Sequence, residues 1–193
     1  MDNLNAKKNP VLYVVQVGGT LLVVCALVAL MLSLVNAFTR DKIIENENAQ
    51  KRGVMAELFE SEAVEFTELD RIDSDGERVE SIYRVARDGA TVGYCVHLRT
   101  LGFGGDIDMM VALTADQTVV GVKILSMSET PGLGSQVGES DYLSQFVGMG
   151  VSLSASDVDM VAGATKSSRA VLNGILDAMS ALGGHLGAGG GAK

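Results

Sequence analysis

The longest apolar stretch of the chain lies near its N-terminus, where no charged residue occurs between Val11 and Val35. A helix needs about 20 mostly apolar residues to cross the hydrocarbon core of a bilayer, and Tyr13 supplies an interfacial aromatic at one end. A cleavable signal peptide has a shorter apolar core of about 7–15 residues. A buried core helix is rarely apolar on every side over such a length. The pattern therefore predicts one uncleaved transmembrane helix over residues 11–36, preceded by an N-terminal tail, residues 1–10.

An amphipathic pattern follows the apolar stretch. Between Asp41 and Glu60 the chain is rich in Glu, Ala, Lys and Asn, and its apolar residues recur at helical intervals. These residues are Ile43, Ile44, Val54, Met55, Leu58 and Phe59. The spacing predicts a helical stalk or linker over residues 37–70.

From Glu77 onward hydrophobic and polar residues alternate, which is the period of a β-strand. Asp88-Gly89 is a hairpin signal, Gly102–Gly105 predicts a glycine-permitted bend, and Ala115–Gln117 predicts a further turn. Successive hairpins form an antiparallel sheet with one face available for a core. The predicted strands cover residues 78–87, 91–98, 107–113 and 119–126.

Two helices are predicted after the strands, a short one over residues 141–147 and a stronger one over 167–182. The second carries an apolar stripe made of Val171, Leu172, Ile175, Met179 and Leu182. The glycine-rich residues 183–193 have little to bury, so a flexible tail is expected there. The fold class expected is α+β: one transmembrane helix, then a domain over residues 71–182 with a mainly antiparallel sheet and flanking helices.

Composition excludes some classes of function. The net charge is −9 and the pI is about 4.6, with scattered Lys and Arg, whereas nucleic-acid binding needs a concentrated basic patch. Cys25 lies in the apolar stretch and Cys95 in a predicted strand, so no disulfide is expected. His97 and His185 are the two histidines, and neither has the neighbours of a metal ligand. We expect neither a nucleic-acid partner nor a metal site.

The first informative motif is Glu129-Thr130-Pro131-Gly132-Leu133-Gly134. Pro131 followed by Gly132 suits the central positions of a type II turn, because Pro presets φ and Gly accepts a positive φ. Gly134 has no side chain and would let a flat ligand approach the backbone closely. Taken alone, the motif is also compatible with a plain turn.

The second motif runs from Asp159 to Thr165, with Gly163 and Ala164 directly before the threonine. The small Gly-Ala pair leaves the Thr165 hydroxyl in an uncrowded loop. Ser167 is expected to cap the last predicted helix. A phosphate ester on Thr165 would then lie at a helix start, where unpaired N–H groups favour an anion. Lys166 and Arg169 are able to add charge-assisted hydrogen bonds, although a plain loop with a helix cap also explains the motif.

Together the two motifs resemble those of the covalent FMN-binding domains. These domains belong to the G subunit of the Rnf ion-translocating electron-transport complex and to its relative, the C subunit of the sodium-translocating NADH:quinone reductase. The resemblance implies that a flavin transferase, using FAD, joins the FMN phosphate to Thr165 and recognises a sequence that includes Asp159. It places the flavin ring beside the first motif. The implied cofactor-binding residues are Thr165, Glu129, Thr130, Pro131, Gly132, Leu133, Gly134, Gly163 and Ala164. The family usually has Ser or Thr where this chain has Ala162.

The resemblance also implies a function. It indicates an electron-relay subunit of a membrane-bound, ion-translocating ferredoxin:NAD oxidoreductase, with other membrane and iron–sulfur subunits as partners. The chain would be a single-pass protein of the bacterial inner membrane with its FMN domain on the outer face. The sequence offers no Ser-His-Asp set and no carboxylate pair at useful spacing, so no independent catalysis is expected. The alternatives are the FMN subunit of the quinone reductase and a flavin-free anchored sensory or assembly domain.

Overall fold

The structure, a computed structural model, describes residues 10–59, 64–70 and 76–189. The chain divides into two compact units between Ala49 and Gln50. Residues 1–9 and 190–193, which belong to the two expected tails, lie outside the described part, so those expectations remain open there.

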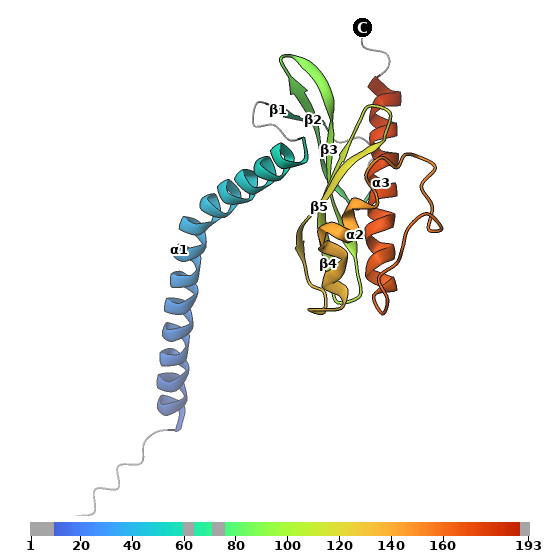
Figure 1. Cartoon of the computed structure of the whole chain (residues 1–193). Helices are drawn as coiled ribbons and strands as arrows, with labels where there is room; N and C mark the ends of the chain where they lie inside the picture. The colour runs from blue at the N-terminus through green and yellow to red at the C-terminus, as the bar shows by residue number, and fades with distance from the viewer. Residues whose placement is uncertain (1–9, 60–63, 71–75, 190–193) are drawn as a thin grey trace, which may run out of the picture. The chain divides into compact units, whose positions relative to one another are not determined.

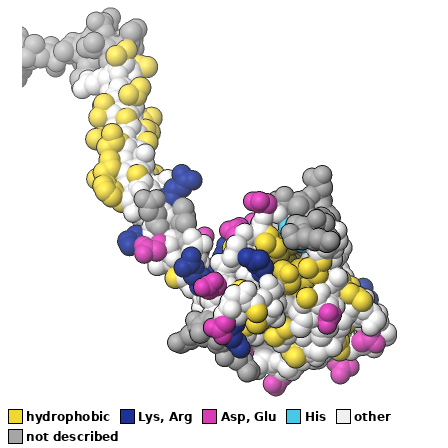
Figure 2. All heavy atoms as spheres, turned by 90° about the horizontal axis from the view of Figure 1, so that it is seen from above, with side chains coloured by type: hydrophobic (Ala, Val, Ile, Leu, Met, Phe, Trp, Pro, Cys, Tyr) yellow, Lys and Arg dark blue, Asp and Glu magenta, His cyan; other side chains and the backbone are white. Residues whose placement is uncertain are grey.

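Helix α1, Pro10–Leu58, begins the described part of the chain. The large apolar side chains between Tyr13 and Phe38 are exposed, and Figure 2 shows hydrophobic side chains gathered along this helix. Among the described residues it is the one helix long and apolar enough to cross a membrane. This property is consistent with a membrane anchor. The expected stalk is not a separate element, because its helical part continues α1 without a break.

Five antiparallel strands form the sheet of the second unit, in the order in which they occur along the chain (Figure 1). The α+β prediction is therefore confirmed. The predicted hairpin turn at Asp88-Gly89 is also confirmed, since both residues have positive φ angles of 52° and 80°. The strands are β1 Glu65–Glu68, β2 Val79–Arg87, β3 Ala90–Leu101, β4 Asp106–Leu113 and β5 Val119–Met127.

Strand β1 corrects the prediction of a helical stalk or linker through residue 70. It pairs with β2, with Phe66 opposite Val85. Four residues are too few for an alternating pattern to stand out in the sequence. Phe66 packs against the apolar cluster that contains the buried Val85. This contact holds the short strand at the edge of the sheet.

Helix α3, Thr165–Gly189, packs on one face of the sheet and forms the main core with it. The predicted apolar stripe is buried: Val171 and Ile175 are completely inaccessible to solvent. The helix does not end at Leu182, as predicted, but runs to Gly189, and Leu186 packs against the core. Residues 183–189 are thus helical rather than a flexible tail, because the sheet supplies an apolar surface for this last part of the helix.

The other face of the sheet is covered in part by the last turns of α1. Met55 is almost fully buried there against Val85, Cys95, Met110 and Ala112. The contact is reinforced by an ion pair from Lys123 Nζ to a Glu57 carboxylate oxygen at 2.7 Å. The end of α1, from Gln50 onward, is therefore an integral part of the second unit.

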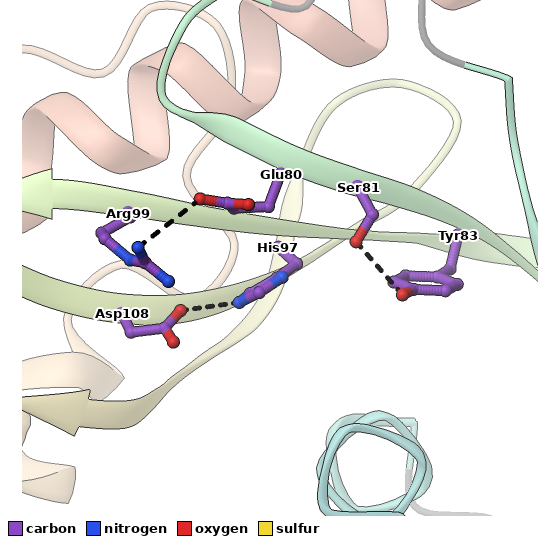
Figure 3. Close-up of polar contacts among 6 residues, drawn as sticks. All are labelled: Glu80, Ser81, Tyr83, His97, Arg99 and Asp108. Carbon is purple, nitrogen blue, oxygen red and sulfur yellow. Dashed lines mark hydrogen bonds and ion pairs between the residues drawn. The ribbon is translucent and has the colours of Figure 1, made fainter. Parts of the chain in front are cut away.

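A polar cluster occupies a neighbouring area around β2, β3 and β4 (Figure 3). His97 is 4% exposed, and its Nε2 lies 2.6 Å from a carboxylate oxygen of Asp108. Ser81 donates a hydrogen bond to the hydroxyl of Tyr83 at 3.1 Å. No set of three His, Cys, Asp or Glu side chains suited to a metal ion occurs among the described residues. The cluster pairs His97 Nε2 with Asp108, whereas the buried Nδ1 of His97 has no hydrogen-bond partner among the described residues.

Cys95 allows a test of this packing. The thiol is completely buried, and burial raises its pKa to about 12. Since the thiolate is the reactive form, the thiol should remain protonated and unreactive at pH 8. In full-length Cys25→Ser protein, where Cys95 is the remaining cysteine, a chromogenic disulfide reagent should label no thiol in the native state and one after denaturation. Rapid labelling of the native protein would show that the reagent reaches the face of the sheet that the last turns of α1 cover.

Candidate functional site

The segment after β5 forms the turn that the first motif predicts. Gly132 has φ +73°, and the Leu133 N–H donates a hydrogen bond to the Thr130 carbonyl at 3.2 Å. The Ser135 hydroxyl oxygen accepts a hydrogen bond from the Gly132 N–H at 2.9 Å. A short 3-10 helix, η2 Gly134–Gly138, follows directly, and helix α2, Ser140–Ser144, comes next. The turn with a positive φ at Gly132 is confirmed, whereas α2 is shorter than the predicted helix over residues 141–147.

The second motif leads directly into α3. Thr165 is exposed and is the first residue of the helix. The helix thus starts two residues earlier than predicted, and Ser167 is not its cap. Ser167 is fully buried, and its hydroxyl donates a hydrogen bond to a carboxylate oxygen of Glu129 at 2.8 Å. This bond joins the first motif to the first turn of α3, just after the second motif, through two residues that are 38 positions apart in sequence.

The buried Ser168 fixes the loop before the helix. Its hydroxyl oxygen accepts a hydrogen bond from the Val161 N–H at 3.1 Å and donates one to the Ala164 carbonyl at 3.1 Å. The hydroxyl of Tyr142 on α2 donates to the Ser168 carbonyl, also at 3.1 Å. Gly163 has φ +78° within this loop. The path of the chain into Thr165 is therefore set by hydrogen bonds to one buried serine.

Gln145 holds the start of the same loop. Its side-chain oxygen accepts a hydrogen bond from the Asp159 N–H at 2.9 Å, and its amide group donates to the Tyr142 carbonyl at 2.8 Å. Asp159 itself is exposed, which leaves its carboxylate at the surface. Sequence reasoning missed Gln145, since a lone Gln outside both motifs carries no pattern.

A cavity of about 150 Å³ lies where the two motifs meet the loop between β3 and β4. Six predicted site residues line it, whereas Pro131, Gly132, Asp159 and Thr165 do not. Thr165 is the chain neighbour of two lining residues, Ala164 and Lys166. The residues that line the cavity are Phe103, Glu129, Thr130, Leu133, Gly134, Gly163, Ala164, Lys166 and Ser167.

Phe103 is the wall residue that sequence reasoning passed over. The loop Gly102–Gly105 is a bend, as predicted, but Phe103 at its tip is 72% exposed and lines the cavity. The Lys166 ammonium group lies 5.6 Å from the centre of the Phe103 ring, within the range of a cation–π contact. The signal available in the sequence was a large aromatic residue placed among three glycines.

Ser168 provides a test of the loop geometry. Ser168→Ala leaves the half-buried Val161 N–H without its acceptor, so we expect a loss of about 1–3 kcal/mol in the free energy of unfolding. Ser144→Ala is a matched control, because Ser144 is exposed and its hydroxyl bonds to the Asp141 carbonyl in its own turn. The control should change stability by no more than about 0.5 kcal/mol. Urea unfolding of both variants measures the difference, and equal losses would contradict the assigned role of Ser168.

Comparison with known proteins places this site in a family. The FMN-binding domain family matches residues 102–180. The G subunit of the ion-translocating oxidoreductase complex of Stutzerimonas stutzeri is 30% identical over 175 residues, which cover 81% of this chain and 75% of that protein. The G subunit of the same kind of complex from Methanosarcina acetivorans is 30% identical over 169 residues, covering 83% and 89%. The G subunit of the Na(+)-translocating ferredoxin:NAD(+) oxidoreductase complex of Acetobacterium woodii is 26% identical over 182 residues, covering 84% and 88%. The chain therefore belongs to the family of G subunits of ion-translocating oxidoreductase complexes, and its pocket lies in an FMN-binding domain.

Proposed function

We propose that the chain carries FMN covalently, as a phosphoester of Thr165, and relays electrons in an ion-translocating ferredoxin:NAD oxidoreductase. The observation that carries the proposal is that Thr165 is exposed and stands in the chain between Ala164 and Lys166, which both line a pocket shared by the two motifs. A phosphate on the Thr165 hydroxyl would lie beside the unpaired N–H groups of the first turn of α3, where the helix dipole favours an anion. Lys166 adds a positive charge beside the attachment point.

The pocket walls suit the flat ring of a flavin. Phe103 and Leu133 offer exposed apolar surface, at 72% and 43% exposure, and Gly163 presents no side chain. Such a combination of apolar walls with a few polar groups is typical of cofactor sites. When bound, FMN supplies the redox chemistry, while the protein sets its position and electrostatic surroundings. Phe103, Leu133 and Thr130 would hold the ring, and Thr165 with Lys166 would hold the phosphate.

Attachment requires a second protein, a flavin transferase that uses FAD. In this step the Thr165 oxygen attacks the phosphorus of the FMN half of FAD and forms the new P–O bond. The bond to the AMP half breaks, AMP leaves, and the hydroxyl proton passes to a base of the transferase. Asp159 has its carboxylate at the surface and its backbone fixed by Gln145, so it can be recognised in one defined position.

The relay role rests on the relatives and on the anchor. The Acetobacterium woodii relative belongs to a ferredoxin:NAD(+) oxidoreductase complex, and α1 is long and apolar enough to span a membrane. We propose that other membrane and iron–sulfur subunits are the electron donors and acceptors, and that the FMN domain faces the outer side of the bacterial inner membrane. Since the relay needs only a fixed flavin, no independent catalysis by this chain is required.

Thr165 provides the direct test of covalent attachment. After co-expression with a flavin transferase, the wild-type chain should give a fluorescent flavin band that survives denaturing electrophoresis. Thr165→Val should lose the band, because only a hydroxyl forms the phosphoester, whereas Thr165→Ser should retain part of it. Mass spectrometry should show the added mass of FMN on the peptide that contains residue 165.

Two variants make this test specific. Thr130→Val changes the other threonine at the pocket, which lines the cavity but is not proposed to be esterified, so its band should persist. Asp159→Ala should lower the flavinated fraction through poorer recognition by the transferase. A band that persists in Thr165→Val and disappears in Thr130→Val would move the attachment point to Thr130.

The orientation in the membrane has its own test. Protease added to intact spheroplasts should digest the domain that follows Thr39, because the proposed location is the outer face. A cytoplasmic marker protein should stay intact in the same sample. Protection of the domain until the spheroplasts are lysed would instead locate it in the cytoplasm.

A further inference from the structure

Glu129 makes contacts that a cofactor ligand would not need. One oxygen of its carboxylate accepts hydrogen bonds from the backbone N–H groups of Phe103, at 2.7 Å, and Gly104, at 3.2 Å. The other oxygen accepts the hydrogen bond from the Ser167 hydroxyl at 2.8 Å. These donors belong to the β3–β4 loop and to the first turn of α3. The carboxylate therefore links all three chain segments that line the pocket.

Two glycines leave room for this carboxylate. A Cβ atom at Gly102 would overlap the Glu129 oxygen that binds the β3–β4 loop. A Cβ atom at Gly134 would lie 2.5 Å from the other oxygen, so it would displace the bond to Ser167. The Glu129 carboxylate therefore needs the space that a side chain at position 134 would fill. This is a different reason for Gly134 from the close approach of a flat ligand that the sequence suggested. Sterics and hydrogen bonding both hold the carboxylate in one position.

We propose that Glu129 is a positioning residue, which sets the separation between the Phe103 loop and the first turn of α3 and thereby the width of the flavin pocket. The inference deepens the proposed function and rests on it. Each carboxylate oxygen already accepts a hydrogen bond from the chain, and bonds to an ionised acceptor are short and strong. Although Glu129 also lines the cavity, its effect on the cofactor is thus transmitted through Phe103 and Ser167.

A double-mutant cycle on the full-length protein tests the linkage. Gly102→Ala alone should lower the melting temperature by about 5 °C or more, because its methyl group displaces the Glu129 carboxylate. In a Glu129→Ala background the same change should have little effect. The one close atom outside Glu129 is Cδ1 at the end of the Ile107 side chain, 2.9 Å from that Cβ, so any effect that remains in the Glu129→Ala background is the contribution of this contact.

Gly93→Ala is the matched control. Its added methyl group would lie 2.7 Å from the backbone carbonyl oxygen of Leu113, a contact that the loss of the Glu129 side chain does not remove. The melting temperature should therefore fall by the same amount in both backgrounds. An equal effect of Gly102→Ala with and without the Glu129 side chain would overturn the proposed linkage.

The flavin reports whether the linkage positions the cofactor. Glu129→Gln keeps an oxygen acceptor for the Phe103 loop and an amide group able to bond to Ser167, so the flavin absorbance and midpoint potential should stay close to the wild type. Glu129→Ala should shift both. An unchanged flavin in Glu129→Ala would make the residue purely structural, and a Gln variant that matches the Ala variant would indicate a direct effect of the charge. Either outcome overturns the proposal.

The two proposals fail in different ways. If no variant, including the wild type, carries flavin after co-expression with the transferase, the proposed function is wrong. The melting-temperature cycle does not depend on flavin and still reports the linkage between Gly102 and Glu129 in the unmodified protein.

Discussion

Burial of the apolar stripe of α3 against the sheet is the interaction on which the site depends. Val171, Ile175 and Leu182 on the helix lie in one core with Leu98, Met109 and Val111 of the sheet, and all are essentially inaccessible to solvent. A fully buried aliphatic side chain contributes about 1.5–3 kcal/mol through removal of its surface from water. A shift of the helix by one turn, about 5.4 Å, would break this packing. The first turn of α3 is therefore held in place by apolar contacts much farther along the helix.

Polar contacts then convert this packing into a defined pocket. The sheet brings the β3–β4 loop and the segment after β5 to one end, since β3 and β5 run in the same direction in the antiparallel meander and both end there. The start of α3 comes to the same end. Hydrogen bonds from Ser167 and from the Phe103 loop meet on Glu129, while Ser168 and Gln145 fix the approach to Thr165. Apolar burial places the elements, and short hydrogen bonds define the details.

Much of this architecture could be predicted from the sequence, because its periodicities are strong. The four longer strands, the amphipathic stripe of α3 and the turn at Gly132 all follow from local patterns. Strand β1 could not be predicted, since Phe66 gains its role only from pairing with β2. The extension of α3 to Gly189 was also missed, because glycine-rich composition hides the support that the core gives to Leu186.

The site shows the same division between local and distant causes. Thr165, Glu129 and Leu133 belong to motifs with a recognisable resemblance, so their importance was visible in the sequence. The bond between Ser167 and Glu129 was not, since it joins residues that no local pattern connects and replaces the capping role that a serine near a helix start suggests. Phe103 was passed over for a related reason. Its glycine neighbours indicate a bend, while its role as a wall depends on Lys166 and Leu133 from other segments.

The order of the strands has a consequence for how the domain folds. Each strand pairs with the next along the chain, so the sheet can grow by closing short loops. Helix α3 is different: the ion pair between Arg78 and Asp177 spans 99 residues. Closing long loops is the entropically costly, slow part of folding, so we expect α3 to dock after the sheet has formed. The pocket would then be the last part of the domain to form. A chain whose Thr165 is in place at the start of the docked α3 would therefore already have a folded sheet.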